Sequence, residues 1–198
     1  MFVPMTEESR LQAIEARLAI QQLAVRYAMA VDSRDLDLMV EQWVPDVWMG
    51  KAWGEGRDAV RRFFGEILQG FYRSMHMIVG HRIDLQDEMT ATGSVYCRAE
   101  HEALDDWVVQ AIVYEDLYRL VDGSWGFAKR VHRHWYTWPV GGKPTGPTFE
   151  LWPNRPSAGA LPDLPHAWAS WERYWADTPS EAIGRVTRHP GPAGGAGG

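Results

Sequence analysis

The stretch TATGSVYCRAEHEALDDWVVQAIVYEDLYRL, residues 90–120, decides the fold class. It contains two long runs rich in β-branched and aromatic residues, Thr90 to Leu104 and Trp107 to Leu120, separated by two aspartates. Runs of this composition that are bounded by short polar segments are typical of β-strands joined by turns. Similar runs, Ser74 to Leu85 and Trp125 to Trp138, lie on either side. We therefore predict an antiparallel meander of strands.

The residues before these strands have helical rather than strand periodicity. Apolar residues from Leu11 to Val31 recur close to the helical spacing, and Thr6 has the residue type and position of an N-cap. Polar residues begin at Asp32, which places Asp32 at or near the end of a long amphipathic helix. Further predicted elements are, in order, a helix over Leu36–Val44, a short strand over Val47–Met49 and a helix over Arg57–Leu68.

Helices followed by an antiparallel meander indicate an α+β domain, because a curved sheet buries one face against helices that lie together. The chain has 198 residues and 45% hydrophobic residues, which suits one domain with a proper core. We expect this domain to span residues 6–138. The order of the elements argues against a parallel doubly wound sheet.

From residue 139 to residue 198 the composition changes to proline, glycine and tryptophan. We interpret this part as an extension with one amphipathic helix near His166–Trp175 and a glycine-rich end that is expected to be disordered. Its aromatic residues favour packing of part of the extension on the barrel mouth or on a neighbouring subunit.

Composition narrows the class of partner. The formal net charge is −6, and no basic run occurs, which argues against binding to nucleic acid or to an anionic membrane. Eleven tryptophans suit a core or a pocket for flat apolar ligands, so we expect a small-molecule partner. The single cysteine, Cys97, excludes an intrachain disulfide. With no export signal and no 18-residue apolar run visible, we expect a cytoplasmic location.

Neighbouring strand residues point to opposite faces of a sheet, so each histidine in a predicted strand can be assigned a face. His101 shares its face with Val95 and Cys97, which belong to an apolar set, and we expect it to point inward. In the first strand, His76 and His81 fall on opposite faces. Alternation therefore predicts that only one of these two histidines faces a pocket.

In the last strand, Arg130, His132, His134 and Tyr136 share one face, and alternation alone leaves open whether this face is inside. His132 and His134 have the spacing of a metal-binding pair, but the sequence offers no clear carboxylate or third ligand near them. We therefore expect no metal. A glycine-rich phosphate loop is also missing, which favours a protein without a cofactor.

An imidazole inside an apolar barrel is costly unless a partner satisfies it, and Asp32 at a helix end is a suitable partner. A carboxylate that accepts from one ring nitrogen leaves the other nitrogen free to act as a general base. Tyr27 lies five residues before Asp32 and can approach the same cavity. The alternatives are that each histidine is only a satisfied core or surface residue, and that Asp32 only ends its helix or caps the next segment.

Several stretches also carry a family resemblance: YAMAVDSRDLD, EGRDAVRRFF, RSMHMIVGHRIDL, MTATGSVYCRAEHEA and IVYEDLYRLVDGSWGFAKR. Together they resemble the SnoaL-like group, with the cone-shaped α+β barrel of nuclear transport factor 2, which includes scytalone dehydratase, bile-acid 7α-dehydratase and hexachlorocyclohexane dehydrochlorinase. The resemblance spans about residues 10 to 138 and implies N-terminal helices packed on a strongly curved, mostly antiparallel sheet.

The resemblance also implies site residues. Asp32 and His76 match the dyad that abstracts a proton in these lyases, and His101 matches the second histidine of scytalone dehydratase. Tyr27 is similar to the pocket tyrosine of the bile-acid enzyme, and Arg130 is similar to an arginine near the leaving group of the dehydrochlorinase. Val31 departs from the group, because scytalone dehydratase has a pocket tyrosine there. We expect the substrate to be bound by Arg130, His132 and Trp48.

These expectations lead to a cofactor-independent lyase, of the dehydratase or dehydrohalogenase type, that acts on a small cyclic apolar substrate. An isomerase or cyclase of a polyketide-like or steroid-like ketone would use the same base, and a ligand-binding module of the same fold would use none. We further expect a homodimer or homotrimer, because Tyr96, Tyr114 and Tyr118 would make the outer face of the sheet partly apolar. The alternative is that these tyrosines are solvated.

Overall fold

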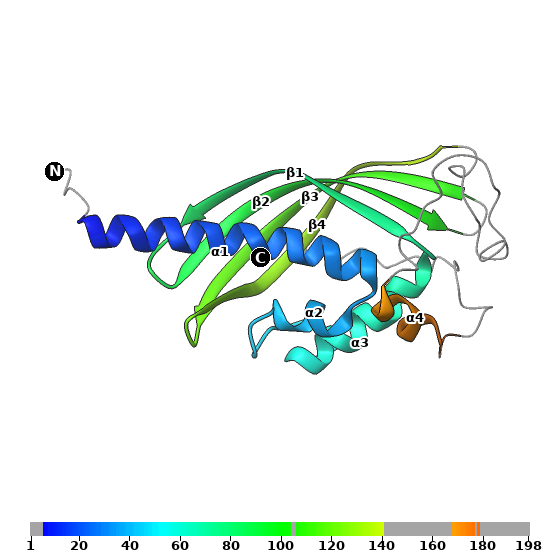
Figure 1. Cartoon of the computed structure of the whole chain (residues 1–198), viewed down its shortest axis with the longest axis horizontal. Helices are drawn as coiled ribbons and strands as arrows, with labels where there is room; N and C mark the ends of the chain where they lie inside the picture. Colours follow the sequence, from blue (N-terminus) through cyan, green and yellow to red (C-terminus); the bar gives the residue numbers. More distant parts are fainter. Residues whose placement is uncertain (1–5, 104–105, 141–167, 177, 179–198) are drawn as a thin grey trace, which may run out of the picture.

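A computed structural model describes residues 6–103, 106–140, 168–176 and 178. Helices come first and strands second, as predicted (Figure 1). The helical part consists of α1 (Glu7–Ser33), α2 (Leu36–Glu41), α3 (Arg57–Ile67) and the short 3-10 helix η1 (Leu68–Gly70). The strands are β1 (Ser74–Leu85), β2 (Thr90–Ala103), β3 (Asp106–Val121) and β4 (Ser124–Pro139), and they are followed by α4 (Ala169–Ala176).

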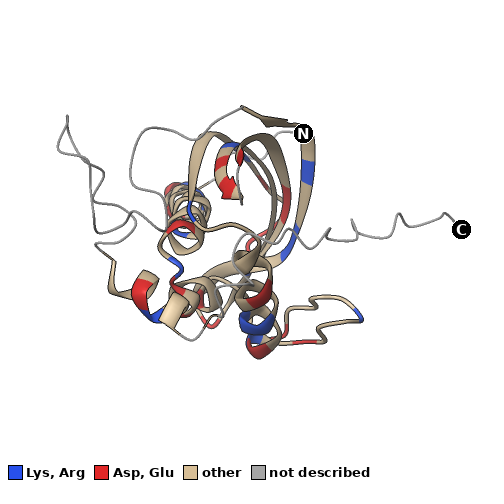
Figure 2. Ribbon diagram, turned by 90° about the vertical axis from the view of Figure 1, so that its right-hand side faces the viewer, with Lys and Arg blue, Asp and Glu red and all other residues tan. Residues whose placement is uncertain are grey.

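The four strands form one antiparallel sheet in the order β1-β2-β3-β4, which curves but does not close. Figure 1 shows α1 lying along one face of this sheet. Helices α2, α3 and α4 lie together near the C-terminal end of α1. Seen along the long axis, the sheet curls over the helices, and acidic and basic residues are interspersed on both layers (Figure 2). The predicted α+β class with a curved antiparallel sheet is confirmed.

Local capping fixes both ends of α1. The Thr6 hydroxyl accepts a hydrogen bond from the Ser9 amide at 3.1 Å, as expected for an N-cap. The helix ends at Ser33, and Arg34 follows in the left-handed conformation with φ 57°. Asp35 then caps α2 by accepting from the Leu38 amide at 2.9 Å. These caps place Asp32 in the last turn of α1.

Two predicted details of the helical part are wrong. The apolar residues Leu11, Ile14 and Leu18 are 55–57% exposed, because Ala13, Ala16 and Ala19 are the residues of this half of α1 that face the strand connections. The segment 47–49 is not a strand, since its only pairing is an isolated bridge between Trp48 and Glu55. In the part of the chain that the structure describes, no helix is long and apolar enough to cross a lipid bilayer.

Aromatic residues fill the space between the helices and the sheet. The Tyr27 ring contacts Phe64, Tyr114 and Phe127 with ring centroids 5.6–6.1 Å apart, and Trp43 packs on Phe127 at 5.3 Å. Edge-to-face contacts of this kind add to the stabilisation from burial alone. The C-terminal half of α1, which contains Asp32, therefore packs tightly against the sheet.

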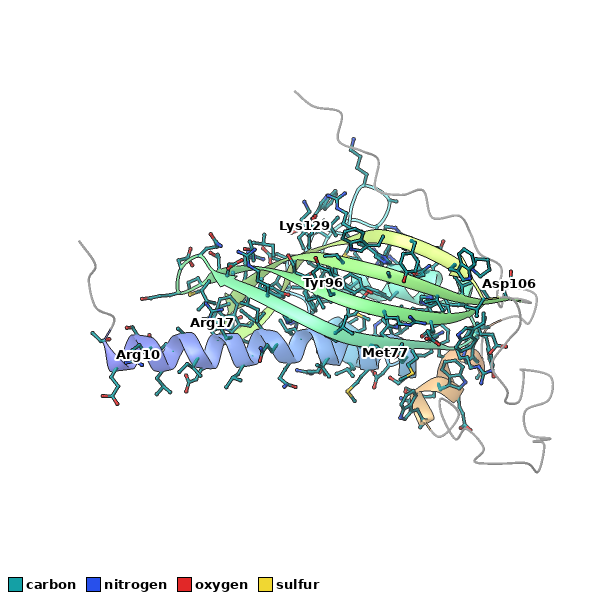
Figure 3. All side chains as sticks on the ribbon, turned by 90° about the horizontal axis from the view of Figure 1, so that it is seen from above. Arg10, Arg17, Met77, Tyr96, Asp106 and Lys129 are labelled. Carbon is teal, nitrogen blue, oxygen red and sulfur yellow. The ribbon has the colours of Figure 1, made fainter. Side chains whose placement is uncertain are left out.

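The three tyrosines expected on the outer face are divided. Tyr96 is 50% exposed and lies in the middle of the outer face in Figure 3, whereas Tyr114 and Tyr118 are buried in the core. The assignment of Tyr114 and Tyr118 to the outer face was wrong. Tyr114, for example, pairs with Val95, and both side chains point inward. Association of copies through the outer face stays a prediction.

β-Bulges change which strand residues face inward. In β1 the pairing steps from Ile78–Cys97 to Gly80–Tyr96, so Val79 has no partner and the alternation restarts after it. His81 consequently pairs with the inward-facing Val95. The prediction that His76 and His81 cannot both face the interior is therefore wrong.

A second register shift, between Ala111 and Ile112, acts on β4. Ile112 pairs with His134, but Ala111 pairs with Tyr136, so Trp135 is the extra residue. His132 and His134 thus keep a common face, and Tyr136 moves to the opposite one. Alternation correctly grouped the two histidines with Arg130 but wrongly included Tyr136.

Candidate active site

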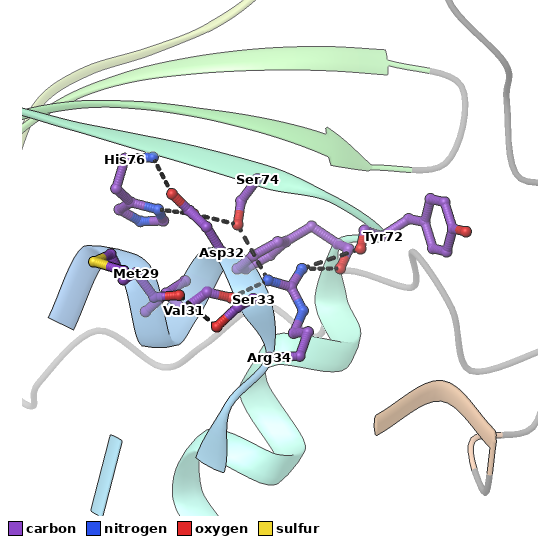
Figure 4. Close-up of polar contacts among 9 residues, drawn as sticks. Met29, Val31, Asp32, Ser33, Arg34, Tyr72, Ser74 and His76 are labelled. Carbon is purple, nitrogen blue, oxygen red and sulfur yellow. Dashed lines mark hydrogen bonds and ion pairs between the residues drawn. The ribbon is translucent and has the colours of Figure 1, made fainter. Parts of the chain in front are cut away.

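Asp32 and His76 lie within hydrogen-bond distance of each other, at the point where the last turn of α1 meets the start of β1 (Figure 4). His76 Nδ1 is 2.7 Å from Asp32 Oδ1, and the backbone N–H of His76 donates to Asp32 Oδ2 at 2.8 Å. The Ser74 hydroxyl donates to Asp32 Oδ1 at 2.8 Å. Both oxygens of the carboxylate thus accept hydrogen bonds from the first residues of β1.

These bonds define the charge of Asp32. Burial pushes the pKa of Asp32 upward, but the hydrogen bonds from His76 and Ser74 outweigh it and hold that pKa below its ordinary value. Asp32 is therefore a carboxylate, and as an acceptor it keeps the proton of the neutral imidazole on Nδ1. His76 Nε2, which makes no hydrogen bond within the described residues, is left as the basic nitrogen.

His101 lies beside this pair on the inner face of β2. Its ring centroid is 5.3 Å from that of His76 and 4.4 Å from that of Phe71. Burial lowers the pKa of His101 well below its ordinary value, and repulsion from His76, from Arg34 and from the two histidines of β4 lowers it further. His101 is therefore a neutral imidazole, which can donate one hydrogen bond from one ring nitrogen and accept another at the other.

The neutral state of His101 makes stability depend on pH. The unfolded chain gains a proton on this side chain below its ordinary pKa of 6.5, whereas the folded protein does not. Stability is therefore complete above pH 6.5 and should fall by up to about 1.4 kcal/mol per pH unit below it. Urea unfolding between pH 5 and 8 should show a shallower decline for His101→Gln. Parallel curves for the two proteins would contradict the assignment.

Arg130 points inward, and its charge is neutralised. Its guanidinium bonds to both oxygens of Asp116, at 2.8 and 2.6 Å, and both side chains are at most 4% exposed. It also stacks on the rings of Tyr27, Tyr114 and Phe127 at 4.2–4.3 Å. Burial raises the pKa of Tyr27 to about 12, so Tyr27 keeps its proton as a hydrogen-bond donor.

The sequence did not reveal that Asp116 joins two further residues in this buried group. The Tyr118 hydroxyl donates to Asp116 Oδ2 at 2.7 Å, and its oxygen is 3.0 Å from His81 Nε2. The Cys97 thiol lies in the field of both Arg130 and Asp32, and burial raises its pKa to about 12. The interior therefore holds a polar group around Asp116 in addition to the polar group around Asp32.

The remaining predicted residues lie apart from the dyad to different degrees. His132 packs on Tyr114 with centroids 5.1 Å apart and on His134 at 4.2 Å, and both histidines are exposed. Trp48 is 61% exposed in the loop between α2 and α3, and the structure does not bring it to the dyad. No cluster of three or more potential metal-ligating side chains occurs among the described residues.

A large groove lies elsewhere in the molecule. Its volume is about 640 Å³, and it runs between the N-terminal half of α1 and the turns that connect the strands. Its walls include Ala16 and Ala19 of α1, Leu85 of β1 and Trp125 of β4. None of the predicted site residues lines it, so the predicted site and this groove are separate.

The model of the SnoaL-like domain matches residues 12–131, which is more than half of the chain. The chain belongs to the SnoaL-like domain family. This confirms the family resemblance seen in the sequence, and the matched segment contains Asp32, His76, His101 and Arg130. No curated protein sequence matches the chain.

Solved structures of several proteins share the fold. LinA has a TM-score of 0.64 and 24% identity, over 71% of this chain and 99% of its own. The hexachlorocyclohexane dehydrochlorinase LinA-type3 from Novosphingobium barchaimii has a TM-score of 0.63 and 21% identity, over 70% and 99%. A putative scytalone dehydratase from Novosphingobium aromaticivorans has a TM-score of 0.57 and 23% identity, over 69% and 97%. At these identities the likeness establishes the fold alone.

Proposed function

We propose that this SnoaL-like protein is a cofactor-independent lyase that uses Asp32 and His76 to abstract a proton from a small cyclic, mostly apolar substrate. The observation that carries this proposal is that Ser74 and His76 form hydrogen bonds to both oxygens of Asp32. A carboxylate held in this way fixes the tautomer and the orientation of the imidazole, as a general base requires.

In the proposed reaction, His76 Nε2 takes a proton from a carbon atom next to an electron-withdrawing group. The electron pair of the broken C–H bond forms a double bond and expels halide, or a hydroxyl group that takes up a proton and leaves as water, from the adjacent carbon. Asp32 stabilises the imidazolium that results, because its charge lies 2.7 Å from Nδ1. His76 returns to the tautomer with Nδ1–H when Nε2 gives its proton to the departing hydroxyl group or, after loss of halide, to solvent.

Departure of the leaving group would be assisted by neutral donors, Tyr27 or His101. Both keep their neutral forms near pH 7, because burial raises the pKa of Tyr27 and lowers the pKa of His101. Arg130 and His132 would contact the substrate further along the inner face. We assign Arg130 a smaller electrostatic role than a free cation would have, since Asp116 already neutralises its charge.

The surroundings of the dyad support the proposed substrate class. Phe71, Tyr114 and Ile112 supply apolar and aromatic surface on the inner side of the sheet, which favours a flat ring. The dehydrochlorinase and dehydratase named in the structural neighbours support an elimination. An isomerase would use the same base and return the proton to another carbon of the same ring.

The test is a measurement of elimination and of solvent-deuterium exchange over a panel of cyclic β-hydroxyketones and polyketide-like ketones. We expect the wild type to exchange the proton next to the carbonyl group of at least one compound. His76→Ala should lower the rate roughly 10²- to 10⁴-fold, the usual contribution of a positioned base. Met75→Ala, an exposed neighbour on the opposite face of β1, should leave the rate unchanged.

The outcomes separate the alternatives. Exchange together with loss of water or halide supports the lyase, whereas exchange with rearrangement of a double bond and no loss supports an isomerase. If the wild type binds these ketones but none exchanges or reacts, and His76→Ala binds them equally well, the protein is a ligand-binding module instead.

A further inference from the structure

Arg34 is a buried cation immediately after α1. It is 1% exposed, and its backbone adopts the left-handed conformation, with φ 57°, that a side chain other than glycine rarely adopts. Its guanidinium donates to the carbonyl oxygens of Val31, Phe71 and Tyr72, the last two at 2.9 and 3.1 Å (Figure 4). Burial lowers the pKa of Arg34 to about 10, which leaves it charged near pH 7.

The same guanidinium reaches the dyad through one side chain. Arg34 donates to Ser74 Oγ at 3.1 Å, and Ser74 donates to Asp32 Oδ1 at 2.8 Å (Figure 4). A serine hydroxyl has a single proton. Because Arg34 occupies the oxygen of Ser74 as a donor, that proton is directed to Asp32 and cannot rotate toward another acceptor without losing a charged partner.

Aromatic rings from α4 cover Arg34. Its guanidinium carbon lies 4.9 Å from the ring centroid of Trp171 and 5.9 Å from those of Tyr174 and Trp175, with Phe71 at 4.8 Å. Helix α4 is also hydrogen-bonded to the domain, since Ser170 Oγ donates to the Ser33 carbonyl at 2.8 Å and the Tyr174 hydroxyl donates to the Gly65 carbonyl at 3.0 Å.

The position of α4 in the chain makes this contact informative. Helix α4 spans Ala169–Ala176 and lies outside the segment 12–131 that matches the SnoaL-like domain. Residues at the start of β1 donate hydrogen bonds to Asp32. Helix α4 excludes water from Arg34, which bonds to one of these residues, Ser74. Without the rings, the guanidinium would face solvent, and its pull on Ser74 would weaken.

We infer that α4 and Arg34 form a positioning device for the dyad, in which Trp171 seals Arg34, Arg34 orients Ser74, and Ser74 fixes Asp32 against His76. The catalytic consequence rests on the proposed function, whereas the hydrogen-bond geometry does not. Arg34, Ser74 and Trp171 are positioning residues, because they act on the reaction only through Asp32.

Two pairs of variants test this device in the full-length chain. Ser74→Ala removes the donor to Asp32, and Ser74→Thr retains a hydroxyl; Trp171→Ala removes the seal, and Trp171→Phe retains an aromatic ring. The control is Trp138→Ala, because Trp138 is 64% exposed on β4. One readout is the proton resonance of His76 Nδ1–H, which reports its bond to Asp32 whether or not a substrate is known. The other is the separation of kcat from KM.

We expect Ser74→Ala and Trp171→Ala to move the Nδ1–H resonance and to lower kcat roughly tenfold, as the loss of one hydrogen bond to a charged group predicts, with KM little changed. Ser74→Thr, Trp171→Phe and Trp138→Ala should resemble the wild type. A resonance and a kcat that stay at wild-type values in both alanine variants would overturn the inference. An inactive wild type with a shifted resonance in these variants would refute the proposed function alone.

Discussion

Replacing Asp32 by asparagine is expected to lower kcat/KM roughly 10²- to 10⁴-fold while the fold remains intact. Asp32 accepts three hydrogen bonds, from the Ser74 hydroxyl, from His76 Nδ1 and from the His76 backbone N–H. An amide has only one acceptor oxygen. If that oxygen faces the backbone N–H, the amide NH₂ group faces Nδ1 and forces the imidazole proton onto Nε2, where it blocks the base.

If the asparagine is turned the other way, its NH₂ group opposes the His76 backbone N–H, and two donors face each other. Either orientation therefore damages the dyad. The measurement is kcat/KM with the substrate identified by the exchange assay, together with circular dichroism to confirm folding. Asp37→Asn is the matched control, because the Asp37 side chain is 75% exposed and bonds only to Arg61 among the described residues. Wild-type activity in Asp32→Asn would remove the dyad from the mechanism.

The second large effect concerns stability rather than activity. Asp116→Ala should destabilise the folded protein by about 3–5 kcal/mol, because it leaves the Arg130 guanidinium buried among aromatic rings without a countercharge. It also removes the acceptor of the Tyr118 hydroxyl. The pair Arg130–Asp116 is at most 4% exposed, so water cannot replace the missing carboxylate without rearrangement of the core.

A neighbouring ion pair provides the comparison. Glu115 and Arg133 also join β3 to β4, at 3.1 Å, but both side chains are more than half exposed. Glu115→Ala should therefore change the free energy of unfolding by less than about 1 kcal/mol. Urea unfolding of both variants at pH 7 measures the difference. Equal effects of the two substitutions would show that burial of Arg130 does not control the energy of its pair.

The sequence predicts the elements that depend on local chemistry. Thr6 and Asp35 cap helices because their side chains bond to amides two or three residues away, and the strand β1 begins and ends at the predicted residues. The predicted helix over 36–44 ends instead at Glu41, and the predicted helix near 166–175 corresponds to α4. Phe149, Leu151 and Trp152, which belong to the apolar residues of the extension that favour its packing, lie outside the described residues, as does the glycine-rich end.

The site is predicted less completely, since faces depend on pairing between strands. His101 was assigned correctly because β2 has no register shift at that position, whereas His81 was not, because the bulge at Val79 is specified by the partner strand. Asp116 was missed, although an aspartate in an apolar run opposite an arginine is a signal once the β3–β4 register is known. Arg34 could not be found by any pattern, because its contacts join distant segments.

Because Val79 is unpaired, β1 is able to lose one residue at this bulge without changing the pairing of its other residues. One unpaired residue lets two histidines five positions apart share the interior, one in each polar group. Deleting Val79 would leave the pairs Ile78–Cys97 and Gly80–Tyr96 consecutive and regular, so His81 would still face inward opposite Val95. A single-codon deletion at the bulge is therefore a change in strand length that spares both polar groups.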